Sequence, residues 1–251
     1  MTSGDGRHIP LMGTFNMRDV GGYPAAGGRT TRWRTLLRSD TLHRADATGP
    51  VLQGYGLRTV LDLRTDFEAE FAPSPSCGPG TRTVRISLIG EDVQEVPQRL
   101  EAFYQYLIDR RGEFIATVIG ELAAAGSVPA LVHCSAGKDR TGIVIGLVLA
   151  VLGVPDEVIA ADYAVSASRI DPSVLEALNH IPGSAAGTGS LTPDLLASPP
   201  SLLLDVLARA RAAGGGTVEG YLTSHGLPPA SLDVLRESLT HSRPSAPRWL
   251  G

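Results

Sequence analysis

Short apolar runs alternate with longer segments of helical periodicity along most of this chain. Branched and aliphatic residues dominate three runs typical of buried strands, at 57–63, 82–88 and 130–133. A further strand-like run at 33–38 follows two Gly pairs, which together predict an N-terminal hairpin that feeds the sheet. Helices are predicted at 47–55, 65–71, 98–125 with a break near 111–112, 141–152, 155–168, 201–213, and 218–239 with a break at 226–229.

This order of elements predicts an α/β fold, with a mainly parallel central sheet, helices on both of its faces and a helical C-terminal region. No segment offers a second core of its own, so we expect one domain over residues 1–251. The stretch 171–200 is rich in Pro, Gly, Ser and Ala, and we expect an irregular excursion or a lid over the site. From His241 onward we expect a flexible tail.

Composition narrows the function classes. The formal net charge is −4, so no general basic field exists to hold nucleic acid, and any anion site must be local. The longest apolar run, 143–154, is about half the ~20 residues that a membrane span needs. The first ten residues have no apolar core, so we expect no signal peptide and a cytoplasmic location. Two cysteines imply no disulfide framework, which suits a reducing compartment.

The basic residues are strongly biased. Of the 22 Lys and Arg residues, all but Lys138 are arginine. This lysine lies between Gly137 and Asp139 in a loop that the next observations single out. We therefore interpret Lys138 as a functional residue and not as part of the background composition.

The loop from Cys134 to Arg140 joins a short buried strand, ending at His133, to an apolar helix. Successive backbone N–H groups in a tight turn, with a helix N-terminus behind them, bind a phosphate. Gly137 permits a left-handed backbone, and the planar fork of Arg140 suits two phosphate oxygens. The residues expected to cradle the phosphate are Ser135, Ala136, Gly137, Lys138, Asp139 and Arg140.

The backbone N–H groups, the helix N-terminus and the Arg140 guanidinium that are expected to bind the phosphate should also surround the thiol of Cys134. A helix N-terminus and nearby cations lower the pKa of a thiol, so we expect a thiolate placed for in-line attack on phosphorus. Thr141 is expected to donate its hydroxyl to this sulfur when water hydrolyses the intermediate. His133 is expected to fix the loop by hydrogen bonding to backbone.

Other interpretations of the loop fit less well. A nucleotide-binding P-loop needs Gly at position 132, where Val132 stands, and Ser or Thr after Lys138, where Asp139 stands. A zinc site needs wider ligand spacing than that of His133 and Cys134. A structural cysteine leaves the flanking strand, glycine, arginine and helix unexplained. A sulfurtransferase loop lacks the Cys-x5-Arg spacing. We expect no metal and no cofactor.

With these residues the chain resembles the protein tyrosine phosphatase superfamily, whose signature is His-Cys-x5-Arg-Thr/Ser. More narrowly, it is similar to bacterial tyrosine and dual-specificity phosphatases with a Cys-x-x-Gly-Lys-Asp-Arg loop, which is like that of phosphoinositide phosphatases. The resemblance implies a phosphatase-like fold, Cys134 as nucleophile and Arg140 as phosphate clamp. Further matching segments are 16–23 (NMRDVGGY), 37–40 (LRSD), 60–64 (VLDLR), 162–163 (DY) and 216–222 (GTVEGYL).

The general acid has three candidates. The resemblance points to Asp139 in the loop and to Asp62, and Asp92 follows a predicted strand in a polar segment. We favour Asp139, since it lies on the leaving-group side of the cradle. Alternatively, Asp139 only orders the loop as a carboxylate at a helix N-terminus, and Asp62 pairs with Arg18 or Arg64.

Three residues of the N-terminal segment are expected to play supporting roles. Asn16, Arg18 and Asp19 are expected to brace the loop. Cys77 lies in a Pro/Gly loop and is expected to be inert, with a reversible disulfide to Cys134 as the alternative.

The sequence therefore predicts a cysteine-dependent phosphomonoester hydrolase with a phospho-cysteine intermediate. Its expected substrates are phosphotyrosine and, because Lys138 adds a second cation beside the cradle, phosphoserine, phosphothreonine or phosphoinositides. The alternative is a phosphatase of a small metabolite such as a nucleotide or sugar phosphate, since aromatic residues are only 5% of the chain. A non-enzymatic phosphate-binding module is disfavoured by the intact set of Cys134, Asp139 and Arg140.

Overall fold

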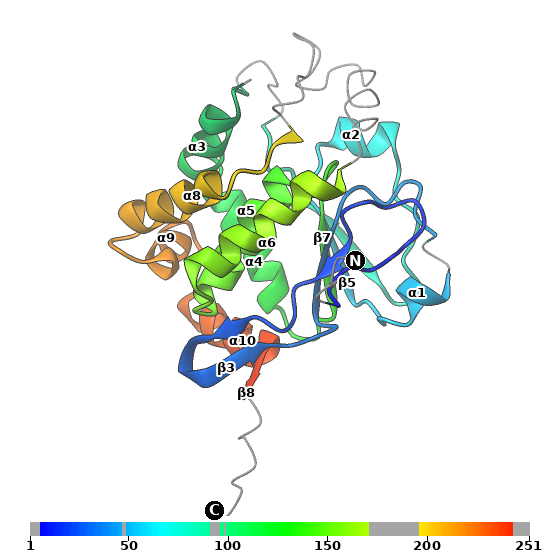
Figure 1. Cartoon of the computed structure of the whole chain (residues 1–251), viewed down its shortest axis with the longest axis horizontal. Coiled ribbons are helices and arrows are strands. Elements are labelled where there is room, and N and C mark those ends of the chain that lie inside the picture. Colours follow the sequence, from blue (N-terminus) through cyan, green and yellow to red (C-terminus); the bar gives the residue numbers. More distant parts are fainter. Residues whose placement is uncertain (1–5, 47–48, 91–95, 98, 171–195, 243–251) are drawn as a thin grey trace, which may run out of the picture.

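The computed structural model of the chain describes residues 6–46, 49–90, 96–97, 99–170 and 196–242. Figure 1 shows a central sheet with a bundle of helices on one side and two short helices on the other. No helix in the described part of the chain is long and apolar enough to cross a membrane.

The five-stranded sheet has the order β1-β4-β7-β5-β6. β4, β7, β5 and β6 are parallel, and only β1 runs antiparallel, against β4. The predicted mainly parallel α/β fold is therefore confirmed. The strands are β1 (Arg18–Asp19), β4 (Leu36–Ser39), β5 (Thr59–Asp62), β6 (Arg82–Arg85) and β7 (Ala130–His133).

Alternate residues of the three central strands enter different apolar clusters. Leu36, Leu61 and Val132 pack under the helical bundle, whereas Leu37, Val60 and Leu131 pack on the opposite face. That opposite face is covered mainly by the N-terminal segment, through Ile9, Leu11 and Met17, and by Leu52 of α1 (Pro50–Gln53). The two faces are thus covered unequally, because the long helices all pack on one of them.

The helical bundle surrounds α5, whose residues from 140 to 149 are all buried. This helix is apolar on every side, as expected for a helix inside a core. The predicted break near 111–112 separates α3 from α4, and the break at 226–229 separates α9 from α10. The bundle comprises α3 (Leu100–Arg110), α4 (Gly112–Ala123), α5 (Asp139–Val151), α6 (Asp156–Arg169), α8 (Pro200–Ala213), α9 (Val218–Ser224) and α10 (Pro229–Leu239).

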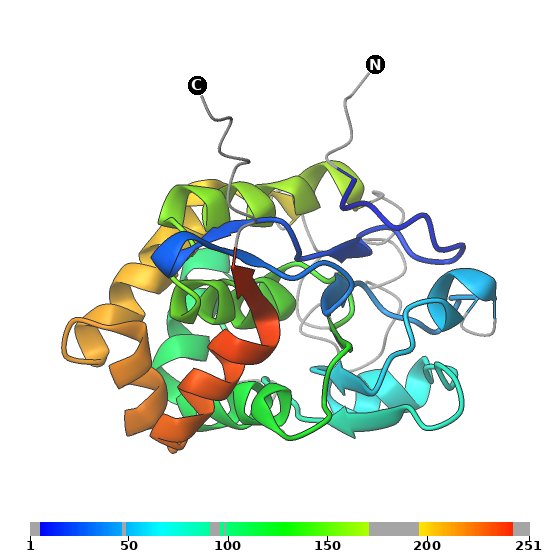
Figure 2. The same cartoon turned by 90° about the horizontal axis from the view of Figure 1, so that it is seen from below.

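A second, smaller sheet joins the two ends of the chain. β2 (Pro24–Ala25) and β3 (Arg29–Thr31) form a hairpin, and β8 (Thr240–Ser242) pairs antiparallel with β3 (Figure 1; Figure 2). The predicted hairpin was expected to feed the central sheet, but this one belongs to the smaller sheet, and the run at 33–38 leads into β4 instead. The expectation of a flexible tail from His241 is therefore wrong for its first two residues, since pairing with β3 satisfies their backbone groups. The rest of that tail lies outside the described residues.

Most of the segment 171–200, for which an excursion or lid was expected, lies outside the described residues. Its last part is described, and α8 begins at Pro200. The expectation of a single domain stays a prediction.

Candidate active site

The loop from Cys134 to Arg140 lies at the carboxyl edge of the sheet. β7 ends at His133, beside Ser39 at the end of β4 and Asp62 at the end of β5. Gly137 has a φ of 64°, and a Cβ there would lie 2.4 Å from Ser39 O. The left-handed backbone requires glycine at this position, as the sequence predicted, and the close approach of β4 requires it as well.

The outer side of the loop is tied down through its carbonyl oxygens. Asn16 Nδ2 donates to Ala136 O at 3.2 Å and to Gly137 O at 3.0 Å, and Arg38 Nη2 donates to Gly137 O at 2.8 Å. A peptide plane whose carbonyl points outward turns its N–H the opposite way. These contacts therefore favour N–H groups that face the inside of the loop, where an anion is expected to bind.

Asp162 of α6 anchors these braces. Its carboxylate accepts from Arg18 Nε at 2.9 Å, from Arg38 Nη1 at 2.5 Å and from Tyr23 Oη at 2.9 Å. Burial alone would raise the pKa of Asp162, but the cations Arg18 and Arg38 outweigh it and hold this pKa below the usual range. Arg18 also donates to Asn16 Oδ1, so the brace forms one connected network.

Arg140 is held by Glu68 of α2 (Asp66–Phe71). Arg140 Nη1 lies 2.7 Å from Oε2 of Glu68, and Nη2 lies 2.7 Å from Oε1. Ser135 Oγ also donates to Oε1, at 2.5 Å. Burial would raise the pKa of Glu68, but Arg140 lowers it to about 2. Besides Glu68, Nη1 lies 3.4 Å from Leu63 O and Nη2 lies 3.3 Å from Ser135 Oγ. Of the five N–H groups of the guanidinium, the Nε–H is therefore the one expected to bind a phosphate oxygen.

The same glutamate completes a capping box. Thr65 Oγ1 accepts from Glu68 N at 3.1 Å, and Glu68 Oε2 accepts from Thr65 N at 2.8 Å. The Thr-x-x-Glu pattern is the sequence signal of such a cap. The start of α2 thereby fixes the carboxylate that holds Arg140.

The surroundings of Cys134 are buried. Cys134 is 2% exposed, and His133 Nδ1 lies 3.3 Å from Cys134 O, which is the backbone contact expected of His133. Burial lowers the pKa of His133 to about 4, so its ring is neutral near pH 7. The Thr141 hydroxyl is buried without a hydrogen-bond partner in the described part of the chain. Its expected bond to Cys134 is thus not formed here.

Asp139 and Lys138 contact each other and the bundle. Lys138 Nζ lies 3.1 Å from Asp139 Oδ1 and donates to Ala197 O at 2.9 Å. Tyr104 Oη donates to the same Oδ1 at 2.7 Å. Lys138 is 1% exposed, so in this structure it is packed between Asp139 and the segment that precedes α8.

The other candidate acids are placed differently. Asp62 accepts from Arg64 Nε at 2.8 Å and from Arg64 Nη2 at 2.7 Å, which is the structural pairing held open above. Although burial would raise it, the pKa of Asp62 is lowered by Arg64. Asp92 lies outside the described residues. Asp139 is therefore the candidate whose carboxylate the described structure places at the end of the loop.

The two cysteines are free and lie in different apolar clusters, Cys134 under the bundle and Cys77 on the opposite side of the sheet. Burial raises the pKa of Cys77 to about 11, in agreement with an inert thiol. Asp19, expected to brace the loop, instead accepts from Gly21 N and Arg34 N in the N-terminal hairpin.

Sequence reasoning missed two residues beside the loop. Glu68 carried a signal, the capping box of α2, but nothing in that pattern pointed to Arg140. Tyr104 carried none, because it occupies an ordinary apolar position of α3.

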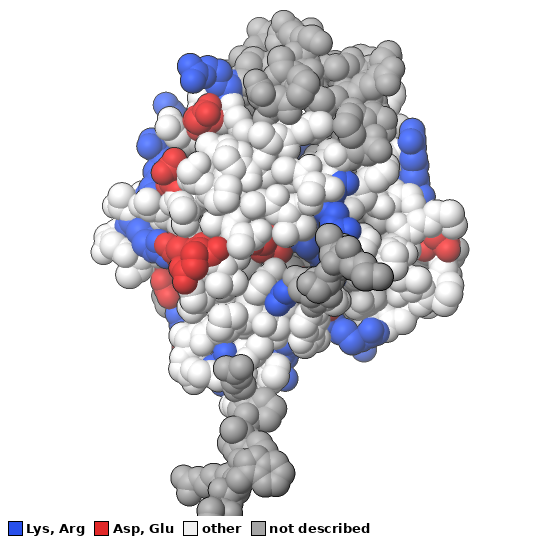
Figure 3. Space-filling view, viewed as in Figure 1, with Lys and Arg blue, Asp and Glu red and all other residues white. Residues whose placement is uncertain are grey.

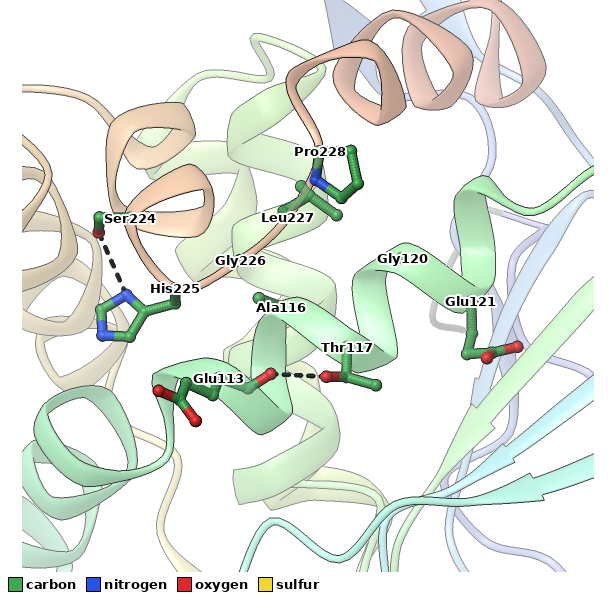
Figure 4. Close-up of a pocket in the computed structure, with 10 residues that line it drawn as sticks. All are labelled: Glu113, Ala116, Thr117, Gly120, Glu121, Ser224, His225, Gly226, Leu227 and Pro228. Atoms are coloured by element: carbon green, nitrogen blue, oxygen red, sulfur yellow. Dashed lines mark hydrogen bonds between the residues drawn. The ribbon is translucent and has the colours of Figure 1, made fainter.

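A hollow of about 600 Å³ lies elsewhere, between α4 and the turn from α9 to α10 (Figure 4). Its polar side chains are those of Glu113, Thr117, Glu121, Ser224 and His225, and none of the loop residues lines it. On the face shown in Figure 3, basic and acidic side chains are scattered among uncharged ones without an extended patch of one sign. This face therefore offers no extended basic surface for phosphate binding.

The chain is similar in sequence to known tyrosine phosphatases over most of its length. The family model described as "Tyrosine phosphatase family" matches residues 9–241. The chain is 33% identical over 234 residues to a Cupriavidus necator protein named as a tyrosine-protein phosphatase, covering 86% of this chain and 84% of that protein. It is 27% identical over 274 residues to the triple specificity protein phosphatase PtpB of Mycobacterium tuberculosis, covering 90% and 96%. The solved structure of P. aeruginosa TpbA matches with 17% identity and a TM-score of 0.37 over 70% of this chain and 94% of that chain.

Proposed function

The chain belongs to the tyrosine phosphatase family and is a phosphatase, and we propose that it hydrolyses phosphomonoesters through a phospho-cysteine intermediate on Cys134. The observation that carries the proposal is the placement of Arg140 by Glu68 beside a loop whose carbonyl oxygens are tied outward. Such a loop presents N–H donors and one guanidinium edge to the three equatorial oxygens of a phosphoryl group in transfer.

The first step is attack by the Cys134 thiolate on phosphorus, in line with the leaving oxygen. The S–P bond forms and the P–O bond to the leaving group breaks, while the Asp139 carboxyl gives its proton to the departing oxygen. Position supports Asp139 as the acid, because it follows the loop directly and begins α5.

The second step returns the enzyme to its starting state. Water attacks phosphorus, the S–P bond breaks, and the Asp139 carboxylate accepts the proton that water loses. The departing sulfur becomes a thiolate again. The buried Thr141 hydroxyl, one residue after Arg140, is suited to stabilise it after a small rotation.

For the substrate we propose phosphotyrosine first, in line with the name of the Cupriavidus necator relative. The word "triple" in the name of the Mycobacterium tuberculosis relative supports a wider range, to which phosphoserine, phosphothreonine and phosphoinositides belong. The contacts of Lys138 with Asp139 and Ala197 O mean that it must turn before it can contact a second phosphate group.

The test is hydrolysis of an aryl phosphate by the full chain with a metal chelator present. We expect activity that vanadate inhibits and that Cys134→Ser abolishes. With a 32P-labelled substrate, acid quenching should trap a labelled protein intermediate. Activity that needs a divalent metal and survives Cys134→Ser would overturn the mechanism. A panel of phosphopeptides, phosphoinositides and phosphorylated metabolites, ranked by kcat/KM, then separates the proposed substrates from a small metabolite.

A further inference from the structure

Three helices meet at one chain of hydroxyl groups behind the loop. Tyr104 of α3 donates to Asp139 Oδ1 of α5 at 2.7 Å, and Tyr104 Oη lies 2.5 Å from Tyr163 Oη of α6. The two tyrosine rings pack edge to face, with centroids 6.2 Å apart and an interplanar angle of 77°. Neither ring has a place in the two chemical steps derived above.

Counting the protons shows which hydroxyl group donates in each of these hydrogen bonds. A tyrosine hydroxyl has one proton, and the proton of Tyr104 is used on Asp139. The Tyr163 hydroxyl must therefore donate to Tyr104. A donor that itself accepts a hydrogen bond is polarised and holds its acceptor more firmly.

Burial keeps both hydroxyls protonated. Tyr104 is 2% exposed and Tyr163 is fully buried, and burial raises the pKa of each above the usual value for tyrosine. The hydrogen bonds from Tyr163 to Tyr104 and from Tyr104 to Asp139 are thus present throughout the pH range in which a phosphatase works.

The backbone is shaped to admit Tyr163. A Cβ at Gly142, in the first turn of α5, would lie 2.9 Å from the Tyr163 ring. Glycine at this position lets the ring lie against the start of α5. The neighbouring Asp162 braces Gly137 O through Arg38, so two successive residues of α6 support the loop and Asp139.

We propose that Tyr104, supported by Tyr163, is a positioning residue for the acid Asp139. Tyr104 and Lys138 both contact Oδ1, which leaves Oδ2 on the other side of the carboxyl group to carry the exchanged proton. In the first step the Oδ2–H bond breaks and the proton passes to the leaving oxygen, while the Tyr104 proton stays on Tyr104. This inference rests on the proposed function, because it needs Asp139 as the acid.

The first measurement compares leaving groups. For Tyr104→Phe we expect kcat/KM for phenyl phosphate, which reports the first step and not the second step shared by all substrates, to fall about 10-fold, the size of one charge-assisted hydrogen bond. The kcat/KM for p-nitrophenyl phosphate, whose better leaving group needs less protonation, should fall far less. Tyr163→Phe should show the same pattern with a smaller loss.

Tyr221→Phe is the matched control. Tyr221 is also fully buried, and its hydroxyl donates to Ile108 O at 2.8 Å, in the bundle and away from Asp139. It should lose stability as the other Tyr→Phe variants do but keep wild-type kinetics with both leaving groups. Equal losses for Tyr104→Phe and Tyr221→Phe would overturn the proposal, as would a Tyr104→Phe enzyme with wild-type kinetics.

A double-mutant cycle separates this inference from the proposed function. If Tyr104 acts through Asp139, Tyr104→Phe should have no further effect in an Asp139→Ala background. An effect that simply adds would overturn the positioning role while the mechanism through Cys134 stands. If the Cys134→Ser variant kept the wild-type rate of hydrolysis, the proposed function would be overturned, and this inference with it.

Discussion

Glu68 holds both terminal nitrogens of Arg140, with Nη1 and Nη2 each 2.7 Å from a carboxylate oxygen. The side chain of Glu68 is itself fixed by the capping box with Thr65. The guanidinium is thereby locked in one plane before any substrate arrives. Preorganisation of this kind removes an ordering cost from phosphate binding.

Glu68→Gln should weaken phosphate recognition, because the neutral amide cannot match two cationic donors. We expect kcat/KM for an aryl phosphate to fall about 10- to 100-fold, with a parallel loss of vanadate affinity. Glu121→Gln is the control, since Glu121 pairs with the exposed Arg82 at 2.7 Å and lines the hollow that none of the loop residues lines. Unchanged vanadate affinity in Glu68→Gln would show that Arg140 needs no such partner.

The sequence predicted the parts of the site that are contiguous. The strand, the turn at Gly137 and the helix after it are specified by neighbouring residues, and all three are found where expected. The breaks between helices at 111–112 and 226–229 were likewise predictable, because Gly and Pro act locally.

The sequence could not predict partners that tertiary packing supplies. Glu68 lies 72 positions before Arg140, and Tyr104 lies 35 before Asp139, so no local period relates them. Pairing of β8 with β3 was missed for the same reason, since three residues carry no strand signal until a partner edge is present. Asp62 shows the converse: its pairing with Arg64, two residues away, was among the predicted alternatives.

Asp162→Asn should destabilise the fold strongly. The carboxylate pairs with Arg18 and Arg38 while almost wholly buried, and its loss leaves two buried cations without compensation. We expect the free energy of unfolding in urea to fall by about 3–5 kcal/mol. Asp156→Asn, on the same helix, breaks a half-exposed pair with Arg211 and should cost at most about 1 kcal/mol. Similar losses for both variants would contradict this account of the brace.

Stability should fall in two acid windows. His133 has a pKa of 6.5 when unfolded and about 4 when folded, so the unfolded state binds its proton more tightly, and stability is lost as the pH falls from 6.5 toward 4. Glu68 has a pKa of 4.5 when unfolded and about 2 when folded, so its contribution is complete above pH 4.5 and lost toward pH 2. Each change corresponds to roughly 3 kcal/mol.

Substitutions test which residue causes the loss of stability in each of these two pH ranges. In urea unfolding followed across the acid range, His133→Asn should flatten the upper window. Glu68→Gln should reduce the lower one, to which Asp62 and Asp162 also contribute because their pKa values are lowered as well. His241→Asn, at a partly exposed position of β8, should leave both in place. A Glu68→Gln protein that still loses the full stability of wild type below pH 4.5 would show that other carboxyls control acid unfolding.

The two thiols should differ in reactivity with iodoacetamide near neutral pH. Both thiols are buried, but burial raises the pKa of Cys77 to about 11, so almost none of it is thiolate, whereas the proposed mechanism requires a thiolate at Cys134. Peptide mass spectrometry should find Cys134 alkylated first, and vanadate should slow that reaction by occupying the loop. Cys77→Ala should leave the labelling rate and the kinetics unchanged, and Cys134→Ser should remove the rapid phase. Rapid alkylation of Cys77 in the folded protein would contradict its assignment as an inert core residue, and labelling of Cys134 that vanadate does not slow would contradict its place in the phosphate cradle.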